Sequence, residues 1–171
     1  MKRWILFTAI VAPIVSLLAF GLTRDPHVLP SAMTGKKAPA FTLQTLEGKT
    51  VSSEDFRGAP FVVNFWATWC GACLAEQDVL REAQKAYADT PIKFLNVVYQ
   101  DDAKQVKKYL KKFKLPMTAL LDSQSRMAID YGVGGIPETF FVDAKGVIQE
   151  KFAGPLPAHY LENQLEALIV R

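Results

Sequence analysis

Cysteine and histidine are scarce in this chain of 171 residues, which contains two of each. So few cysteines exclude a small disulfide-dense scaffold. The composition is otherwise ordinary, with 50% apolar and 22% charged residues, which excludes a disordered or collagen-like chain. The length allows one domain of usual size plus a short additional segment.

The folded part of the chain also lacks an excess of charge. The formal net charge of +3 resides in residues 1–24, which contain Lys2, Arg3 and Arg24 and no acidic residue. Residues 25–171 carry 17 basic and 17 acidic side chains. This balance argues against a surface that binds nucleic acid, because such a surface needs an excess of Lys and Arg.

One long uncharged run is present near the N-terminus. Residues 4–22 (WILFTAIVAPIVSLLAFGL) contain no charge and would span about 28 Å as a helix, close to the ~30 Å core of a bilayer. Because Lys2 and Arg3 precede the run, the N-terminus is expected to stay in the cytoplasm. We predict an uncleaved signal anchor over residues 1–23; a cleaved signal peptide and a buried core helix are the alternatives.

The rest of the chain predicts a linker and one α/β domain. Residues 24–35 contain Pro26 and Pro30 and show no helical or strand periodicity, so a linker is expected. In residues 36–171, strands alternate with helices and a hairpin and a helix follow, which predicts a mixed sheet with helices on both sides. The expected strands are 41–43, 61–66, 92–99, 118–121, 139–142 and 147–152. The expected helices are 71–88, 102–113, 123–131 and one near the C-terminus, with a helical turn capped by Ser52 or Ser53.

The helix expected over residues 102–113 is strongly amphipathic. Its apolar residues fall at helical spacing: Val106, Tyr109, Leu110 and Phe113. The other face carries Lys104, Lys107, Lys108, Lys111 and Lys112. We interpret this lysine cluster as a solvated helix face.

Both cysteines lie where the strand over 61–66 ends and the next helix begins, as Cys70 and Cys73. A disulfide across so short a loop would stabilise the fold by only about 2 kcal/mol. Zinc would need further ligands, and His27 and His159 lie far away along the chain. Leu74 occupies the place where a haem attachment motif has histidine. Redox chemistry is the favoured interpretation, with a structural disulfide and a metal site as alternatives.

The position of Cys70 suggests how the pair would work. At a helix N-terminus its sulfur faces unpaired amides and the positive end of the helix dipole, which favour thiolate over thiol. We therefore expect Cys70 to be the attacking nucleophile. Cys73, one turn further on, is expected to be shielded and to resolve the mixed disulfide.

Several motifs carry a family resemblance. The segments WATWCGAC (66–73) and GGIPET (134–139) resemble the active-site and cis-proline loops of thioredoxin-like proteins. Residues 35–171 more narrowly resemble the CcmG/DsbE proteins, which are membrane-anchored thiol:disulfide interchange proteins of cytochrome c maturation related to TlpA and ResA. The motifs that carry this narrower resemblance are GKKAPAFTL (35–43), YQDD (99–102), YGV (131–133), PETF (137–140) and AGPL (153–156).

The resemblance implies a thioredoxin fold behind an N-terminal transmembrane helix, on the periplasmic side of the bacterial inner membrane. It also implies Cys70 as nucleophile, Cys73 as resolving thiol and Pro137 as a cis residue facing them. The substrate would be the disulfide in a C-x-x-C-H segment of apocytochrome c. A membrane thiol transporter of the DsbD/CcdA type would return electrons, and other cytochrome c maturation components are possible partners. Apart from the redox-active pair, no cofactor and no metal are expected.

One departure from the commoner thioredoxin pattern makes two glutamates candidates for acid–base assistance to the thiols. Asn64 occupies the strand position where many thioredoxins have a buried Asp, and it cannot exchange a proton. Glu76, one turn beyond Cys73, and Glu138, after Pro137, are therefore the candidates to assist the thiols as acid or base. Surface carboxylates without a catalytic role are the alternative for both.

Two other functions fit parts of the sequence. A TlpA- or ResA-like reductase would serve copper-site assembly or general periplasmic thiols with the same chemistry. A tethered haem- or metal-binding chaperone would use Cys70 and Cys73 as ligands, but two thiolates and the distant His159 make a poor site. Gly71 and Ala72 stand between the cysteines, without the proline of the commonest thioredoxin pair.

Overall fold

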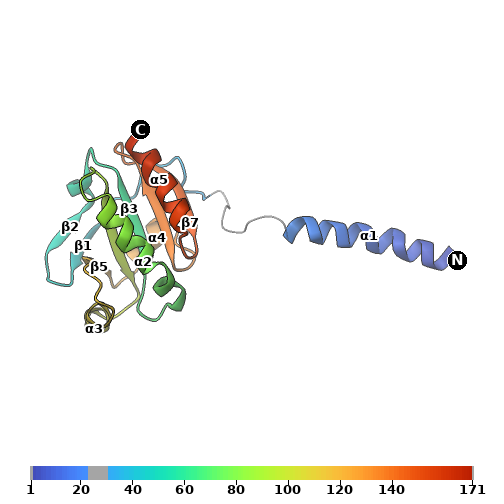
Figure 1. Ribbon diagram of the computed structural model, residues 1–171, viewed down its shortest axis with the longest axis horizontal. Helices are drawn as coiled ribbons and strands as arrows, with labels where there is room; N and C mark the ends of the chain where they lie inside the picture. The colour runs from blue at the N-terminus through green and yellow to red at the C-terminus, as the bar shows by residue number, and fades with distance from the viewer. Residues whose placement is uncertain (1, 23–30, 171) are drawn as a thin grey trace.

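The computed structural model describes residues 2–22 and 31–170. Helix α1 (Lys2–Leu22) covers the segment expected to be the anchor and contains Pro13. Its large apolar side chains, such as Trp4 and Leu17, are exposed, and Figure 1 draws it apart from the sheet. Among the described residues, no helix combines the length and the apolar character that crossing a bilayer requires. A helix at this position is thus present, whereas a membrane span is not shown.

The remaining elements follow the predicted α/β order (Figure 1). The strands are β1 (Thr42–Thr45), β2 (Thr50–Ser52), β3 (Phe61–Trp66), β4 (Lys93–Tyr99), β5 (Ala119–Asp122), β6 (Glu138–Val142) and β7 (Ile148–Ala153). The helices are α2 (Gly71–Ala86), α3 (Ala103–Phe113), α4 (Arg126–Asp130) and α5 (Ala158–Val170), with a 3-10 turn η2 (Ser53–Phe56).

These strands form one mixed sheet in the order β2-β1-β5-β4-β3-β6-β7. The central strands β5, β4 and β3 are parallel to one another. The pairs β3–β6, β6–β7, β1–β5 and β1–β2 are antiparallel. The predicted mixed sheet and terminal hairpin are therefore confirmed.

Strand β3 lies at the centre because its sequence, FVVNFW, is buried on both faces. Val63 and Phe65 pack with α4 on one side, where Met127 and Ala128 complete a cluster. Val62 faces the opposite side, in a cluster formed with α2 and α5. Helices therefore cover both faces, with α2 and α5 in front of the sheet in Figure 1.

A third cluster connects the end of β3 to helix α3. Trp66, Cys70 and Cys73 pack there with Val106 of α3. The Trp66 ring lies 5.5 Å from that of Tyr109, measured between centroids. The apolar face predicted for residues 102–113 is thus the face that holds α3 against the cysteine-bearing segment.

One strand, β2, was not expected from the sequence. A turn at Glu47 and Gly48 follows β1, and Gly48 adopts a φ of +82°, which favours glycine. The chain then turns back so that β2 pairs with β1, for example Leu43 with Val51. Three residues are too few for a period of two to be recognised.

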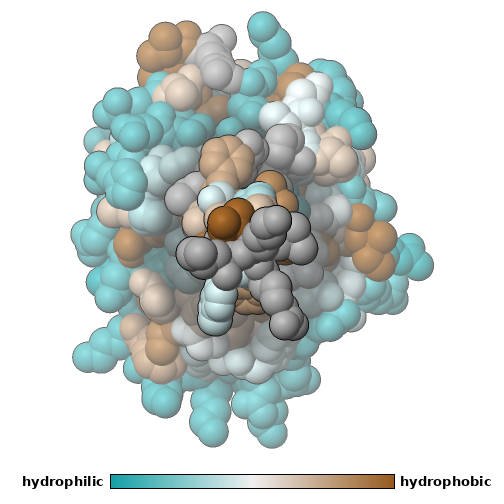
Figure 2. Space-filling model, turned by 90° about the vertical axis from the view of Figure 1, so that its right-hand side faces the viewer, coloured by the Kyte–Doolittle hydropathy of each residue, from teal (hydrophilic) through white to brown (hydrophobic). Residues whose placement is uncertain are grey.

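The domain begins before its first strand. Of the predicted linker over 24–35, residues 24–30 lie outside the described residues. Met33 packs against the cluster on the α4 side, and the Gly35 amide donates a hydrogen bond to the Ile148 carbonyl. Figure 2 shows one face of the molecule, on which hydrophilic side chains prevail around the edge and hydrophobic ones are scattered.

Candidate active site

Cys70 and Cys73 form a disulfide at the N-terminus of α2. Cys70 has extended backbone angles and caps the helix, and its sulfur accepts a hydrogen bond of 3.0 Å from the Cys73 amide. The exposed fraction is 8% for Cys70 and 0% for Cys73. Cys70 is thus the more accessible of the two cysteines, which agrees with the expected roles of Cys70 as nucleophile and Cys73 as resolving thiol.

The loop before β6 also contacts this disulfide. The peptide bond between Ile136 and Pro137 is cis. The Ile136 carbonyl oxygen lies 3.7 Å from the Cys70 sulfur. The structure thus brings together two segments that are more than sixty residues apart in the chain.

Glu76 is buried, with an exposed fraction of 1%. It lies three residues after Cys73 on the inner face of α2, so the two side chains are neighbours on one helix face. Its Oε1 accepts a hydrogen bond of 2.8 Å from Asn64 Nδ2, and its Oε2 accepts one of 2.9 Å from the Leu156 amide. Asn64 Nδ2 also donates to Thr139 Oγ1 at 3.1 Å.

Burial makes this carboxyl group an unusually weak acid. Loss of hydration raises the pKa of Glu76 to about 7, while the hydrogen bonds from Leu156 and Asn64 lower it in part. A carboxyl group with a pKa near neutrality can both accept and return a proton at physiological pH. Asn64, which cannot exchange a proton, instead holds Glu76 in place.

Glu138 is also buried, but its neighbours differ. Its carboxylate lies 2.8 Å from the Lys151 ammonium and accepts a hydrogen bond of 3.3 Å from the Gly134 amide. Lys151 Nζ donates in addition to the Gly132 carbonyl at 2.9 Å. These contacts fix the loop that carries Pro137, whereas the acid–base role expected of Glu138 stays a prediction.

Gln100 and Asp101, which follow β4, hold the loop of residues 66–70 in position. Neither was proposed as a site residue from the sequence. Asp101 Oδ2 accepts a hydrogen bond of 2.6 Å from the Thr68 amide. The indole of Trp69, 59% exposed, donates to the Gln100 carbonyl at 3.2 Å. The acidic pair after the strand over 92–99 was the available signal, because Asp side chains readily accept hydrogen bonds from backbone amides.

A groove opens beside the disulfide, between the first turn of α2 and helix α3. Its volume is about 320 Å³, and its lining includes Cys70, Leu74, Lys108, Tyr109, Lys112 and Phe113. We call it the thiol groove. It is the place where a segment of another molecule could lie against the reactive sulfur.

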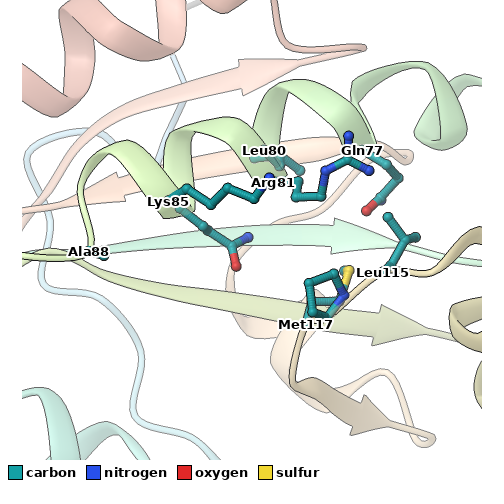
Figure 3. A pocket seen from close by; sticks show the side chains of 9 residues that line it. Gln77, Leu80, Arg81, Lys85, Ala88, Leu115 and Met117 are labelled. Carbon is teal, nitrogen blue, oxygen red and sulfur yellow. The ribbon is translucent and has the colours of Figure 1, made fainter.

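Another cavity, of about 310 Å³, lies between α2 and the segment before β5 (Figure 3). It contains neither cysteine, and its Arg81 and Lys85 are paired with Asp78 or Glu82. No group of three or more His, Cys, Asp or Glu side chains within residues 2–22 and 31–170 is arranged to hold a metal. The thiol groove is therefore the cavity relevant to Cys70.

Fold and site together define a thioredoxin-like thiol:disulfide oxidoreductase. The family Redoxin matches residues 33–169. A thiol:disulfide interchange protein DsbE of Pseudomonas fluorescens biotype C is 39% identical over 171 residues, covering 98% of this chain and 94% of the relative. The chain belongs to the DsbE family of thiol:disulfide interchange proteins.

Other similarities agree with this family. The thiol:disulfide interchange protein HelX of Rhodobacter capsulatus is 34% identical over 149 residues, covering 85% of this chain and 82% of the relative. A DsbE crystal structure from Chlorobium tepidum has a TM-score of 0.75 at 28% identity, covering 81% of this chain and 99% of that one. StoA of Bacillus subtilis has a TM-score of 0.65 at 26% identity, covering 75% and 97%.

Proposed function

We propose that this protein is a reductase that opens the disulfide of apocytochrome c C-x-x-C-H segments before haem attachment. The observation that carries the chemistry is the unequal exposure of the two cysteines beside a buried acid. The substrate class is supported by the resemblance of residues 35–171 to the CcmG/DsbE proteins. Electrons would return to the oxidised pair from a membrane thiol transporter of the DsbD/CcdA type.

The reaction needs two exchanges. The Cys70 thiolate attacks one sulfur of the substrate disulfide, forms a mixed disulfide and releases the other substrate sulfur as a thiolate, which takes up a proton. Cys73 then loses its proton and attacks the Cys70 sulfur. The Cys70–Cys73 disulfide forms, and the second substrate sulfur leaves and is protonated. One substrate disulfide is reduced and one enzyme dithiol is oxidised.

Glu76 is the proposed acceptor of the Cys73 proton. It is buried with Cys73, lies one turn further along α2, and has a pKa raised to about 7. An acceptor inside the protein is needed, because water cannot readily reach a thiol whose residue is fully buried. The acid would return the proton when the oxidised pair is reduced again.

We also propose that the domain works outside the cytoplasm, attached to the membrane by residues 1–23. The support is the charge distribution of the sequence: Lys2 and Arg3 precede a run of 19 uncharged residues. Alkaline extraction of membranes from expressing cells tests this attachment. Recovery of the full chain in the pellet supports it, whereas a shortened chain in the soluble periplasmic fraction would show a cleaved signal instead.

Trapping of the mixed disulfide tests the reductase proposal. In the Cys73→Ser variant the second exchange is blocked, so Cys70 should accumulate in a mixed disulfide with apocytochrome c. The Cys70→Ser variant should trap nothing and is the matched control. Recovery of copper-site proteins alone, or of general periplasmic proteins, would assign the TlpA- or ResA-like alternative.

The direction of the reaction is tested separately in cells. Alkylation of free thiols should find Cys70 and Cys73 mainly reduced, as a reductase requires in an oxidising compartment. A pair that is mainly disulfide would indicate an oxidase and contradict the proposal.

A further inference from the structure

The thiol groove has an asymmetric lining. On the α2 side lie Cys70 and Leu74, and Leu74 is 40% exposed. On the α3 side lie the rings of Tyr109 and Phe113, whose centroids are 4.6 Å apart. This apolar floor lies directly beside the sulfur that a partner must reach, and Tyr109 is held in place by the buried ring of Trp66.

Charge at the groove has one sign only. Lys108 and Lys112 line it and are exposed, and no acidic residue is among the lining residues. The Lys112 ammonium lies 5.0 Å from the centre of the Phe113 ring, above the apolar floor. Within the described part of the chain, neither lysine forms an ion pair with a carboxylate.

The basic character is local to this helix and the residues that follow it. Residues 103–117 contain six lysines and no acidic residue, although residues 25–171 as a whole carry equal numbers of basic and acidic side chains. The solvated helix face expected from the sequence is thus only part of the account, because two of its five lysines line the groove that holds Cys70.

We infer that the thiol groove docks an acidic segment of the protein substrate, next to the disulfide that Cys70 attacks. The occupant is an extended peptide stretch with an apolar side chain against Leu74, Tyr109 and Phe113 and a carboxylate facing Lys108 or Lys112. Complementary charge at the edge of an interface mainly accelerates association and selects among partners. This inference rests on the proposed function and adds a rule for the choice of substrate.

A pair of synthetic disulfide peptides tests the rule. Both contain one C-x-x-C disulfide and the same apolar residue, and they differ in carrying glutamates or lysines beside it. The full chain, reduced and kept in non-ionic detergent, is mixed with each peptide, and the rate of peptide reduction is measured. The acidic peptide should react about tenfold faster at about 0.02 M salt, and the difference should shrink at about 0.5 M salt, where the Debye length falls to a few Å.

Charge reversal on α3 supplies the matched variants. Lys108→Glu combined with Lys112→Glu should reverse the preference, so that the basic peptide reacts faster. Lys107→Glu combined with Lys111→Glu changes the net charge of the same helix equally but leaves the groove lining unchanged. This control should keep most of the preference for the acidic peptide. Circular dichroism compares the folding of both variants with that of the original chain.

The outcomes separate the two proposals. Equal rates for both peptides at low salt, with rapid reduction of each, would overturn the docking inference and leave the reductase intact. A preference lost equally in both double variants would assign it to overall charge and also overturn the groove as its origin. Failure to reduce either peptide would contradict the proposed function itself. The peptide comparison and its salt dependence use the original chain, so they hold even if a variant fails to fold.

Discussion

Lys151 of β7 places its ammonium 2.8 Å from the carboxylate of Glu138, the residue that follows the cis-proline. Both side chains are largely buried, and Lys151 also donates to the Gly132 carbonyl. The Gly134 amide donates to Glu138 from the same loop. One ion pair therefore fixes both ends of the loop that contacts Cys70.

The first prediction concerns this ion pair. Lys151→Met should lower the free energy of unfolding by about 3 kcal/mol, because it leaves the buried Glu138 carboxylate without its cation. Urea unfolding measures the loss. Arg57→Met removes an exposed ion pair with Glu54 and should cost about 1 kcal/mol or less. Equal losses in the two variants would show that the Glu138–Lys151 pair is not an internal support.

The second prediction concerns the stability of the oxidised protein as a function of pH. Glu76 has a folded-state pKa of about 7 against an ordinary value of 4.5. Between these values the folded chain keeps the proton and the unfolded chain loses it, so stability should fall as pH rises from about 4.5 to about 7. The full decrease attributable to Glu76 is about 3 kcal/mol.

Glu76→Gln provides the comparison for this pH dependence. The amide keeps the shape of the side chain and does not titrate, so the variant should lose this part of the pH dependence. Urea unfolding at about pH 5 and about pH 8 measures the difference for both proteins. If the two proteins show the same dependence, burial does not shift the acidity of Glu76.

The third prediction concerns proton transfer from Cys73. If Glu76 accepts this proton, resolution of the mixed disulfide should accelerate as pH rises through about 7, where the carboxyl group loses its own proton. Glu76→Gln should abolish this rise and slow resolution about tenfold or more at pH above 7. The initial attack by Cys70 should change little, because Cys73 does not take part in it. Stopped-flow measurement of single-turnover exchange separates the two steps.

Glu138→Gln is the matched control for Glu76→Gln in this experiment. Its carboxylate contacts Lys151 and the Gly134 amide, so this substitution should leave the pH profile of resolution in place. If Glu138→Gln loses the pH dependence of resolution and Glu76→Gln keeps it, Glu138 and not Glu76 accepts the proton of Cys73.

The fourth prediction concerns Asp101. Its carboxylate accepts hydrogen bonds from the Thr68 and Asp102 amides. Asp101→Ala removes both acceptors and should lower the free energy of unfolding by about 1–3 kcal/mol. Asp101→Asn keeps one acceptor oxygen and should lose less. Thermal unfolding ranks the variants, and an alanine variant as stable as the asparagine variant would contradict the role of this carboxylate.

Much of the fold could be predicted because its signals are local. Strand β3 was predicted with its observed bounds, since a short and nearly continuous apolar run between Pro60 and the cysteine loop suits a strand buried on both faces. Helix α3 was predicted within one residue from its apolar spacing. Its lysine pattern was also visible, but the proximity of Lys108 to Cys70 depends on how α3 packs against α2.

The partner of Glu138 could not be predicted, because a β-bulge intervenes. Regular pairing outward from Val142 and Ile148 would place Lys151 opposite Thr139, on the other face of the hairpin. The register instead shifts between Phe141 and Val142, so that Lys151 pairs with Phe140. A shift of one residue moves a side chain to the opposite face, and here it brings Lys151 to the side of Glu138.

The environment of Glu76 could not be predicted from the sequence for a different reason. Its hydrogen-bond donors, Asn64 and Leu156, lie 12 and 80 residues away in the chain. No local pattern records such long-range contacts. The sequence named Glu76 as a candidate but left open whether its carboxyl group was exposed or buried.

The hydrogen bond from the Leu156 amide connects the C-terminal part of the chain to the acidity of Glu76. This amide lies in the connection between β7 and α5, and its hydrogen bond lowers the pKa of Glu76. Displacement of this amide would remove the donor and make Glu76 a still weaker acid. A substitution or movement between β7 and α5 can thus change the pKa of a buried acid beside the cysteines while leaving both cysteines and their loop unchanged.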